Sequence, residues 1–168
     1  MDISKLNSLV ELYFKKKEEV DPNRPFLQWL KISKKEIYSW EDITSRIFKL
    51  TAKIKSLIKE GDRCLILSEN RPAWLMIDIS IMNAGGISVP IFTTYSKNDY
   101  EYILNDCKPS LIFVSNKDQF NKIKKFISND VKQIISFEKI DGESLFIQEI
   151  LEERKIRLIE EEIKKDID

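Results

Sequence analysis

The sequence predicts an α/β fold with an open, doubly wound and mainly parallel sheet, flanked by helices and preceded by a small antiparallel hairpin near the amino terminus. Three short runs rich in Ile, Leu and Val, at residues 64–67, 87–91 and 111–114, do not alternate with polar residues. Such runs are typical of strands buried on both faces. Helical patterns separate the runs, and strands that alternate with helices indicate a parallel sheet. Where successive strands are neighbours, right-handed crossovers place both connecting helices on one face.

The segment before the sheet begins with a predicted helix and the hairpin. Apolar residues at helical spacing predict the helix over residues 3–18, and Pro22 then prevents its continuation. Residues 26–32 and 37–38 flank a charged turn. We therefore expect two antiparallel strands there, separate from the central sheet.

A second helix is expected to follow the hairpin directly. Ser39 is a suitable cap for it, and Asp42 stands three residues later, as in a weak form of the capping box. An apolar stripe then continues to about Lys59. Gly61 is expected to end this helix in a left-handed conformation.

Two further helices connect the three predicted strands. Pro72 suits a first helical turn, and residues 73–84 are apolar on nearly every face. A helix of this kind packs between layers, so we expect Trp74 to be a largely buried core aromatic. Ser96 is expected to cap the next helix, which runs to about Asp106.

The rest of the chain predicts one more strand and two helical regions. A short basic helix is expected over residues 118–127 and a fourth strand over residues 132–137. From Glu143 onward the apolar spacing is helical and the residues become increasingly charged. We expect residues 1–151 to form one α/β subdomain and residues 152–168 to form a charged helical tail.

Composition excludes several classes of function. The 168 residues include 28 basic and 28 acidic side chains and no histidine, so no overall charge favours nucleic acid. A zinc site or an imidazole-based triad is not expected, because the chain has no histidine and its two cysteines, Cys64 and Cys107, are far apart in the sequence. Charged residues interrupt every apolar run before membrane-spanning length, so we expect no membrane anchor and a cytoplasmic protein.

Several motifs in the strand region carry a family resemblance. They are Gly-Asp-Arg-x-x-x-Leu-Ser-Glu-Asn-Arg-Pro-x-Trp at residues 61–74, Ala-Gly-Gly-x-x-Val-Pro-Ile at 84–91 and Tyr-Ile-Leu-Asn-Asp at 102–106. In this order and spacing they resemble the amino-terminal part of AMP-forming acyl-CoA synthetases, in particular that of the long-chain fatty acid ligases. The resemblance extends over residues 22–115.

This resemblance implies a parent enzyme that uses ATP, Mg²⁺ and coenzyme A to activate a fatty acid through an acyl-adenylate. The phosphate-binding loop of the family is rich in Gly, Ser and Thr and ends Gly-x-Pro-Lys. None of the four glycines, at positions 61, 85, 86 and 142, lies in such a loop. We therefore expect an amino-terminal fragment without catalytic or metal-binding residues, inactive alone, whose partner is the remainder of the adenylating domain.

The loop after the second strand is the candidate binding element. By the resemblance, Phe92, Thr93 and Thr94 line the site for the nucleotide end of coenzyme A. Loops at the carboxyl ends of parallel strands are also where open α/β sheets bind ligands. Thr93 and Thr94 stand where related enzymes often have glycines. A purely structural loop is the alternative.

Two other polar positions have competing interpretations. Glu69, Asn70 and Arg71 follow the first strand, where they either contact a ligand or neighbouring domain, or form a capped and hydrogen-bonded corner. Asp78, within the apolar helix, is either a carboxylate with a raised pKa or a buried polar group with a partner. For the whole chain, the alternative function is a self-standing, non-enzymatic α/β binding module.

Overall fold

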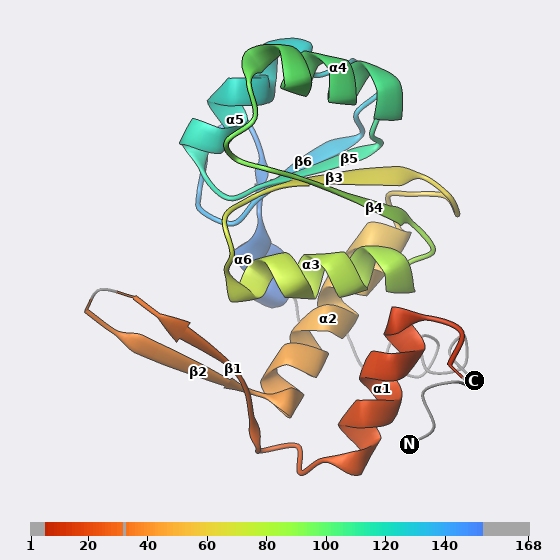
Figure 1. The fold of residues 1–168 in the computed structure, drawn as a ribbon, viewed down its shortest axis with the longest axis vertical. Coiled ribbons are helices and arrows are strands. Elements are labelled where there is room, and N and C mark those ends of the chain that lie inside the picture. Colours follow the sequence, from red (N-terminus) through yellow and green to blue (C-terminus); the bar gives the residue numbers. More distant parts are fainter. Residues whose placement is uncertain (1–5, 32, 153–168) are drawn as a thin grey trace.

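A five-stranded parallel sheet forms the centre of the computed structural model, which describes residues 6–31 and 33–152 (Figure 1). The strand order is β4-β3-β5-β6-β7, and each neighbouring pair is parallel. The strands are β3 (Arg63–Leu67), β4 (Ile87–Ile91), β5 (Leu111–Val114), β6 (Gln133–Ser136) and β7 (Leu145–Phe146). The predicted α/β class with a parallel sheet is confirmed.

Helices cover both faces of this sheet. Figure 1 shows α2, α3 and α6 on one side of the sheet and α4 and α5 on the other. The helices are α1 (Leu9–Glu19), α2 (Trp40–Lys55), α3 (Pro72–Asn83), α4 (Lys97–Cys107), α5 (Lys117–Ile123) with the 3₁₀ turn η2 (Lys124–Phe126), and α6 (Ile147–Glu152). The chain passes from β4 back over β3 to β5, so α3 and α4 lie on opposite faces, as right-handed crossovers require.

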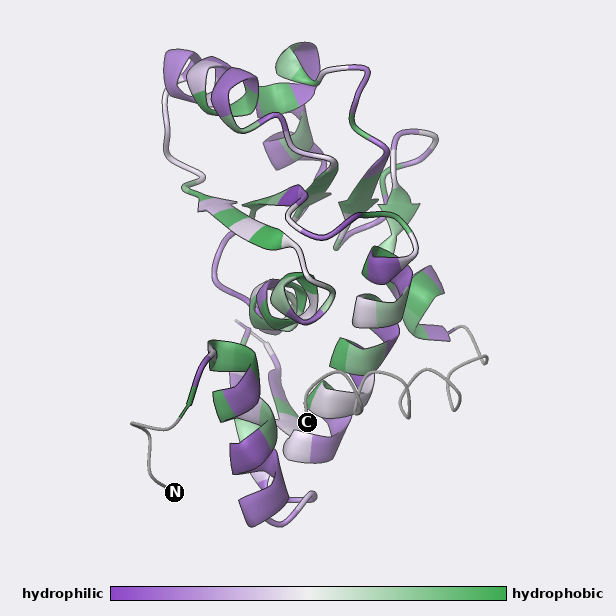
Figure 2. Cartoon of the chain, turned by 90° about the vertical axis from the view of Figure 1, so that its right-hand side faces the viewer, coloured by the Kyte–Doolittle hydropathy of each residue, from purple (hydrophilic) through white to green (hydrophobic). Residues whose placement is uncertain are grey.

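Successive residues of the central strands face different helical layers. Cys64 and Ile66 belong to the core cluster shared with α2 and α3, whereas Leu65 and Leu67 belong to the cluster shared with α4 and α5. All four side chains are fully buried. Figure 2 shows hydrophobic residues concentrated in the strands, whereas the helices carry both hydrophobic and hydrophilic residues. Burial on two faces explains why these strands are continuous apolar runs.

The hairpin and α1 lie beside the α2–α3 layer. The hairpin pairs β1 (Pro25–Leu30) with β2 (Lys35–Ser39) in antiparallel register, as predicted. The Ser39–Asp42 capping box begins α2 at the expected place. The ring of Tyr13 on α1 packs against Trp40 at 5.5 Å, and its hydroxyl lies 2.9 Å from the hydroxyl of Thr44, which attaches α1 to α2.

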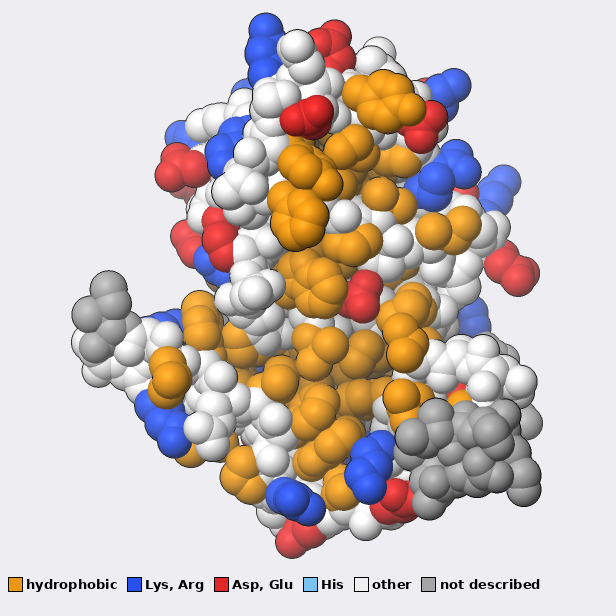
Figure 3. Space-filling view, viewed as in Figure 1, with side chains coloured by type: hydrophobic (Ala, Val, Ile, Leu, Met, Phe, Trp, Pro, Cys, Tyr) orange, Lys and Arg blue, Asp and Glu red, His pale blue; other side chains and the backbone are white. Residues whose placement is uncertain are grey.

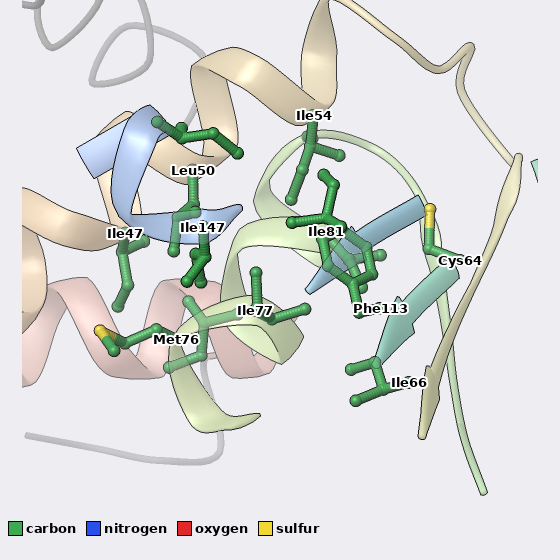
Figure 4. Packing of buried hydrophobic residues seen from close by; sticks show 14 of the residues in the cluster. Ile47, Leu50, Ile54, Cys64, Ile66, Met76, Ile77, Ile81, Phe113 and Ile147 are labelled. Carbon is green, nitrogen blue, oxygen red and sulfur yellow. The ribbon is translucent and has the colours of Figure 1, made fainter. Parts of the chain in front are cut away.

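The larger core cluster joins α2 and α3 to the sheet. Figure 4 shows side chains of α2, α3 and α6 meeting those of the strands, among them Ile47, Leu50, Ile54, Met76, Ile77, Ile81, Ile147, Ile66 and Phe113. The buried Ser80 hydroxyl donates to the carbonyl of Met76 at 2.6 Å and is 3.2 Å from that of Ile47. The side of α3 that faces α2 and the sheet is therefore fully packed.

The strand β4 occupies one edge of the sheet, and within residues 6–31 and 33–152 its only sheet partner is β3. The N–H of Ile87 donates to the carbonyl of Asp62 at 2.9 Å, so the amides of Val89 and Ile91 also face β3. Ser88 and Pro90 then face the open edge. A proline, which has no N–H, is tolerated there.

Two local predictions differ from the structure. Leu145 and Phe146 pair with β6 as the short strand β7, and the predicted helix begins only after them. Gly61 has the expected left-handed backbone, with φ 80°, but α2 ends at Lys55 and Gly61 lies in a later turn. Except for Glu152, the predicted charged tail lies outside the described residues. No helix among the described residues has both the length and the apolar character needed to cross a membrane.

Candidate functional site

The candidate site is a pocket at the edge of the sheet where β3 and β4 end. These strands are parallel, so the segments that follow them, 68–71 and 92–95, meet at the same edge. The pocket between them has a volume of about 560 Å³. Its lining consists of Ser68, Glu69, Asn70, Trp74, Pro90, Ile91, Phe92, Thr93 and Thr94. The structure thus brings the predicted residues 92–94 together with the polar corner after β3.

The aromatic ring of Phe92 is open to solvent at this pocket. Its exposed fraction is 68%, and it contacts Tyr95 edge to face with 5.3 Å between ring centroids. An exposed ring held by a second ring offers a flat surface for a planar group. Trp74, expected to be largely buried in the core, is only partly buried, because it begins α3 beside this pocket.

Two side chains from other elements hold the loop that follows β4 through hydrogen bonds to its carbonyls. The hydroxyl of Tyr100 on α4 donates to the carbonyl of Phe92 at 3.0 Å. The ammonium of Lys122 on α5 donates to the carbonyl of Thr93 at 2.7 Å. Tyr100 is only 2% exposed, so its hydroxyl is fixed by packing. Sequence reasoning missed both residues, because a side chain that binds a distant carbonyl leaves no periodic signal.

A polar network spans the point where the strand order reverses, between β3 and β5. The amide of Gln119 on α5 donates to the carboxylate of Glu69 at 2.7 Å. Arg71 is 3.4 Å from Glu69 and 3.0 Å from Glu138. Burial would raise the pKa of Glu69, but its hydrogen bonds, including that from Gln119, and the Arg71 charge lower it overall. The corner is therefore a hydrogen-bonded unit, and its carboxylate is charged at neutral pH.

Asp78 and Cys64 do not belong to this pocket. Asp78 accepts a hydrogen bond from the Ser88 hydroxyl at 2.6 Å, which fits the interpretation as a polar group with a partner. Burial raises the pKa of the Cys64 thiol to about 12, so this cysteine is an inert core residue.

The groups at the pocket suit binding better than catalysis. They are an exposed ring, three hydroxyl side chains, an amide and a carboxylate that is already hydrogen-bonded. Among residues 6–31 and 33–152, no group of three His, Cys, Asp or Glu side chains is placed to hold a metal ion. The described part of the chain can therefore orient a ligand at this edge.

Sequence comparison gives consistent matches. The family model described as "AMP-binding enzyme" matches residues 14–166. Long-chain-fatty-acid–CoA ligase ACSBG1 of Rattus norvegicus is 29% identical over 123 residues, which is 73% of this chain and 15% of that protein. Fatty acyl-CoA synthetase A of Dictyostelium discoideum is 30% identical over 88 residues, 52% of this chain and 13% of that protein. The chain thus aligns with about one seventh of these relatives.

Solved structures show the same fold. A benzoate CoA ligase from Burkholderia xenovorans superposes with a TM-score of 0.71 at 14% identity, covering 87% of this chain and 28% of that one. An acyl-CoA synthetase from Brucella canis gives a TM-score of 0.67 at 14% identity, covering 80% and 25%. At such low identity these neighbours support the fold only.

Proposed function

The chain belongs to the AMP-binding enzyme family, and from this membership we propose that it forms the amino-terminal part of a longer fatty acid–CoA ligase. The names of the matched relatives support a fatty acid as substrate. The whole enzyme would form an acyl-adenylate from the acid and ATP with Mg²⁺, and then transfer the acyl group to coenzyme A. Residues 1–151 would be its first α/β subdomain.

Within that enzyme, Phe92, Thr93 and Thr94 would form one wall for the nucleotide end of coenzyme A. The observation that carries this proposal is the 560 Å³ pocket with the exposed Phe92 ring at the carboxyl edge of the sheet. The ring can stack on a base, and Thr93 and Thr94 offer hydroxyls. When bound, coenzyme A supplies the thiol that accepts the acyl group. The residues described here would hold and orient it.

Three hydrogen bonds anchor the backbone of this wall. Tyr100 and Lys122 hold the carbonyls of Phe92 and Thr93, and the Tyr95 N–H also points to the Phe92 carbonyl at 3.4 Å. A loop fixed in this way loses little conformational freedom on binding. This supports a binding role despite the threonines at positions often occupied by glycine.

The first experiment compares two exposed aromatic residues in the full-length enzyme. Phe92→Ala removes the proposed stacking surface, whereas Tyr102→Ala removes a ring of similar exposure, 70% against 68%, from the outside of α4. Stacking on a base contributes about 1–3 kcal/mol, so the KM for coenzyme A should rise about 5- to 150-fold only for Phe92→Ala. Adenylation should be unchanged in both, because it precedes use of the thiol. Equal KM values for coenzyme A in the two variants, or an equal loss of adenylation and of coenzyme A use in Phe92→Ala, would contradict the proposed coenzyme A wall.

The second experiment tests residues 1–168 alone. Adenylation requires donors fixed around the ATP phosphates before charge moves onto pyrophosphate. None of the chain's four glycines lies in a phosphate-binding loop. Fatty acid-dependent ATP–pyrophosphate exchange should therefore be at background for residues 1–168 and appear in the full-length protein. Exchange by residues 1–168 that a substitution within them abolishes would contradict this assignment.

A further inference from the structure

The polar corner after β3 lines the candidate coenzyme A pocket together with the exposed Phe92 ring. Leu67 and Ile91, the last residues of β3 and β4, are partners in the parallel register. Neighbouring strands lie about 4.8 Å apart, so the two segments that follow them begin side by side. Glu69 and Asn70 are therefore placed to meet the edge of a planar group that stacks on Phe92.

The carboxylate of Glu69 is held in place and is still accessible from the pocket. Its side chain is 41% exposed. One carboxylate oxygen accepts a hydrogen bond from the amide of Gln119 at 2.7 Å, and the other is 3.4 Å from Arg71. The two oxygens of a carboxylate offer about four acceptor positions, so positions remain for a donor in the pocket. Glu69 can therefore accept a hydrogen bond from a ligand without losing the contacts that orient it.

The contact between Gln119 and Glu69 is kept at a cost to stability. Gln119 is only 7% exposed, and its amide nitrogen donates to Glu69. The oxygen of the same amide is buried and has no hydrogen-bond partner among the described residues. A buried polar atom without a partner makes the fold less stable. Such an arrangement indicates that the position of the Glu69 carboxylate serves binding as well as folding.

Asn70 adds a side-chain amide beside this carboxylate, and it is exposed at the pocket. A carboxylate accepts hydrogen bonds from an amino group, whereas a side-chain amide can donate to a ring nitrogen. The edge of adenine presents this combination, an exocyclic amino group beside ring nitrogens that accept. By contrast, Figure 3 shows a continuous hydrophobic area over α1 and α3. The edge of a base needs hydrogen-bond partners, so the polar corner suits it better than that area.

We propose that Glu69 is a specificity-determining residue for the base of coenzyme A: its carboxylate accepts the exocyclic amino group of adenine, and Asn70 donates to a neighbouring ring nitrogen. The inference rests on the proposed function, which places the nucleotide end of coenzyme A in this pocket. A base with an oxo group instead of the amino group would bring an oxygen towards the carboxylate. The pocket therefore selects against a hypoxanthine base.

Titration calorimetry with the full-length protein tests this assignment. The two ligands are coenzyme A and its deaminated analogue, in which hypoxanthine replaces adenine. The analogue loses a hydrogen bond to a charged group, so its Kd should be at least about tenfold higher than that of coenzyme A. Glu69→Gln should reduce the ratio of the two Kd values to about one, because the glutamine amide can also donate to the oxo group.

The matched control is Glu138→Gln, which makes the same chemical change. Glu138 also pairs with Arg71, at 3.0 Å, but lies outside the lining of the pocket. The original ratio of the Kd values should therefore be kept in Glu138→Gln. Circular dichroism verifies that both variants are folded.

Other outcomes would overturn the role of Glu69. Equal Kd values for the two ligands in the original protein, or an unchanged ratio in folded Glu69→Gln, would contradict direct contact with the base. An equal loss of the ratio in Glu138→Gln would assign the effect to Arg71.

Ligase activity is measured separately, so that this inference and the proposed function are tested independently. An active fatty acid–CoA ligase with equal Kd values would retain the proposed function and contradict the role of Glu69. Selective binding of coenzyme A through Glu69 in a protein without ligase activity would do the reverse. A full-length protein that binds neither ligand would contradict both.

Discussion

Gly85 and Gly86 are adjacent, but they are required for different physical reasons. Gly85 has φ 81°, a left-handed backbone that costs other residues about 1–2 kcal/mol. Gly86 is required by close contact instead. A Cβ there would lie 2.8 Å from Ile58 Cδ1, 3.1 Å from Ile81 Cγ2 and 3.2 Å from the Ile81 carbonyl oxygen. That oxygen accepts the N–H of Gly86 itself at 2.9 Å, so it cannot move away without loss of the bond.

Gly85→Ala and Gly86→Ala should therefore respond differently when Ile58→Val is added to each. Gly86→Ala overpacks the site and should reduce the free energy of unfolding by about 1–3 kcal/mol. Ile58→Val removes the Cδ1 atom that makes the shortest contact, so it should recover at least about 0.5 kcal/mol in the double variant. The three atoms nearest to a Cβ at Gly85 all belong to Glu60, at 3.6 Å and beyond. Ile58→Val and Gly85→Ala should therefore be additive.

Urea unfolding of the single and double variants, followed by tryptophan fluorescence and circular dichroism, measures these free energies. A cost below about 0.5 kcal/mol for Gly86→Ala would show that the chain yields easily at this position. Additivity of Gly86→Ala and Ile58→Val would show that Cδ1 is not the atom in conflict. Either result would refute the close-contact argument for Gly86.

Two further predictions concern reactivity and pH. In the native protein, iodoacetamide should label the half-buried Cys107 before Cys64, because Cys64 is fully buried and its pKa is raised to about 12. Mass spectrometry of the labelled peptides will show the order. Labelling of Cys64 before Cys107 would contradict the burial of Cys64. The capping carboxylates Asp42 and Asp99 have pKa values lowered from 3.8 by hydrogen bonds from the serine that begins each box. Each pKa is lower in the folded than in the unfolded state, so this stability is fully present above about pH 4 and is lost as pH falls through the folded value. Urea midpoints of an Asp42→Asn, Asp99→Asn double variant should therefore fall less between pH 5 and 2 than those of the original chain, and parallel curves would disprove the linkage.

The sequence predicts the strands well, because burial on two faces removes polar residues from them. The runs 64–67, 87–91 and 111–114 match β3, β4 and β5 within one residue. The two-residue strand β7 was missed because Leu145 and Phe146 directly precede α6, whose apolar spacing is helical. A pattern that short cannot distinguish the last strand residues from a first helical turn.

The order of the strands and the contacts of the pocket needed the three-dimensional structure. Nothing in the local pattern states that the chain returns past β3 after β4, so that β5 pairs with the other side of β3. The site prediction at Phe92 came from its place after a parallel strand and from the family resemblance. Its supports, Tyr100 and Lys122, and the Glu69 partner Gln119 come from other elements. Such long-range pairs depend on tertiary packing, which has no period in the sequence.

The proline at the edge of the sheet affects how molecules of this protein meet one another. An exposed edge strand can accept a strand from a neighbouring molecule and begin aggregation. On the open side of β4, however, only Ser88 has an N–H to donate, because Pro90 has none. An incoming strand would find one amide donor where a regular ladder of this length offers two. Pro90 therefore disfavours strand-to-strand polymerisation while the apolar surface nearby remains open to a partner that binds through side chains.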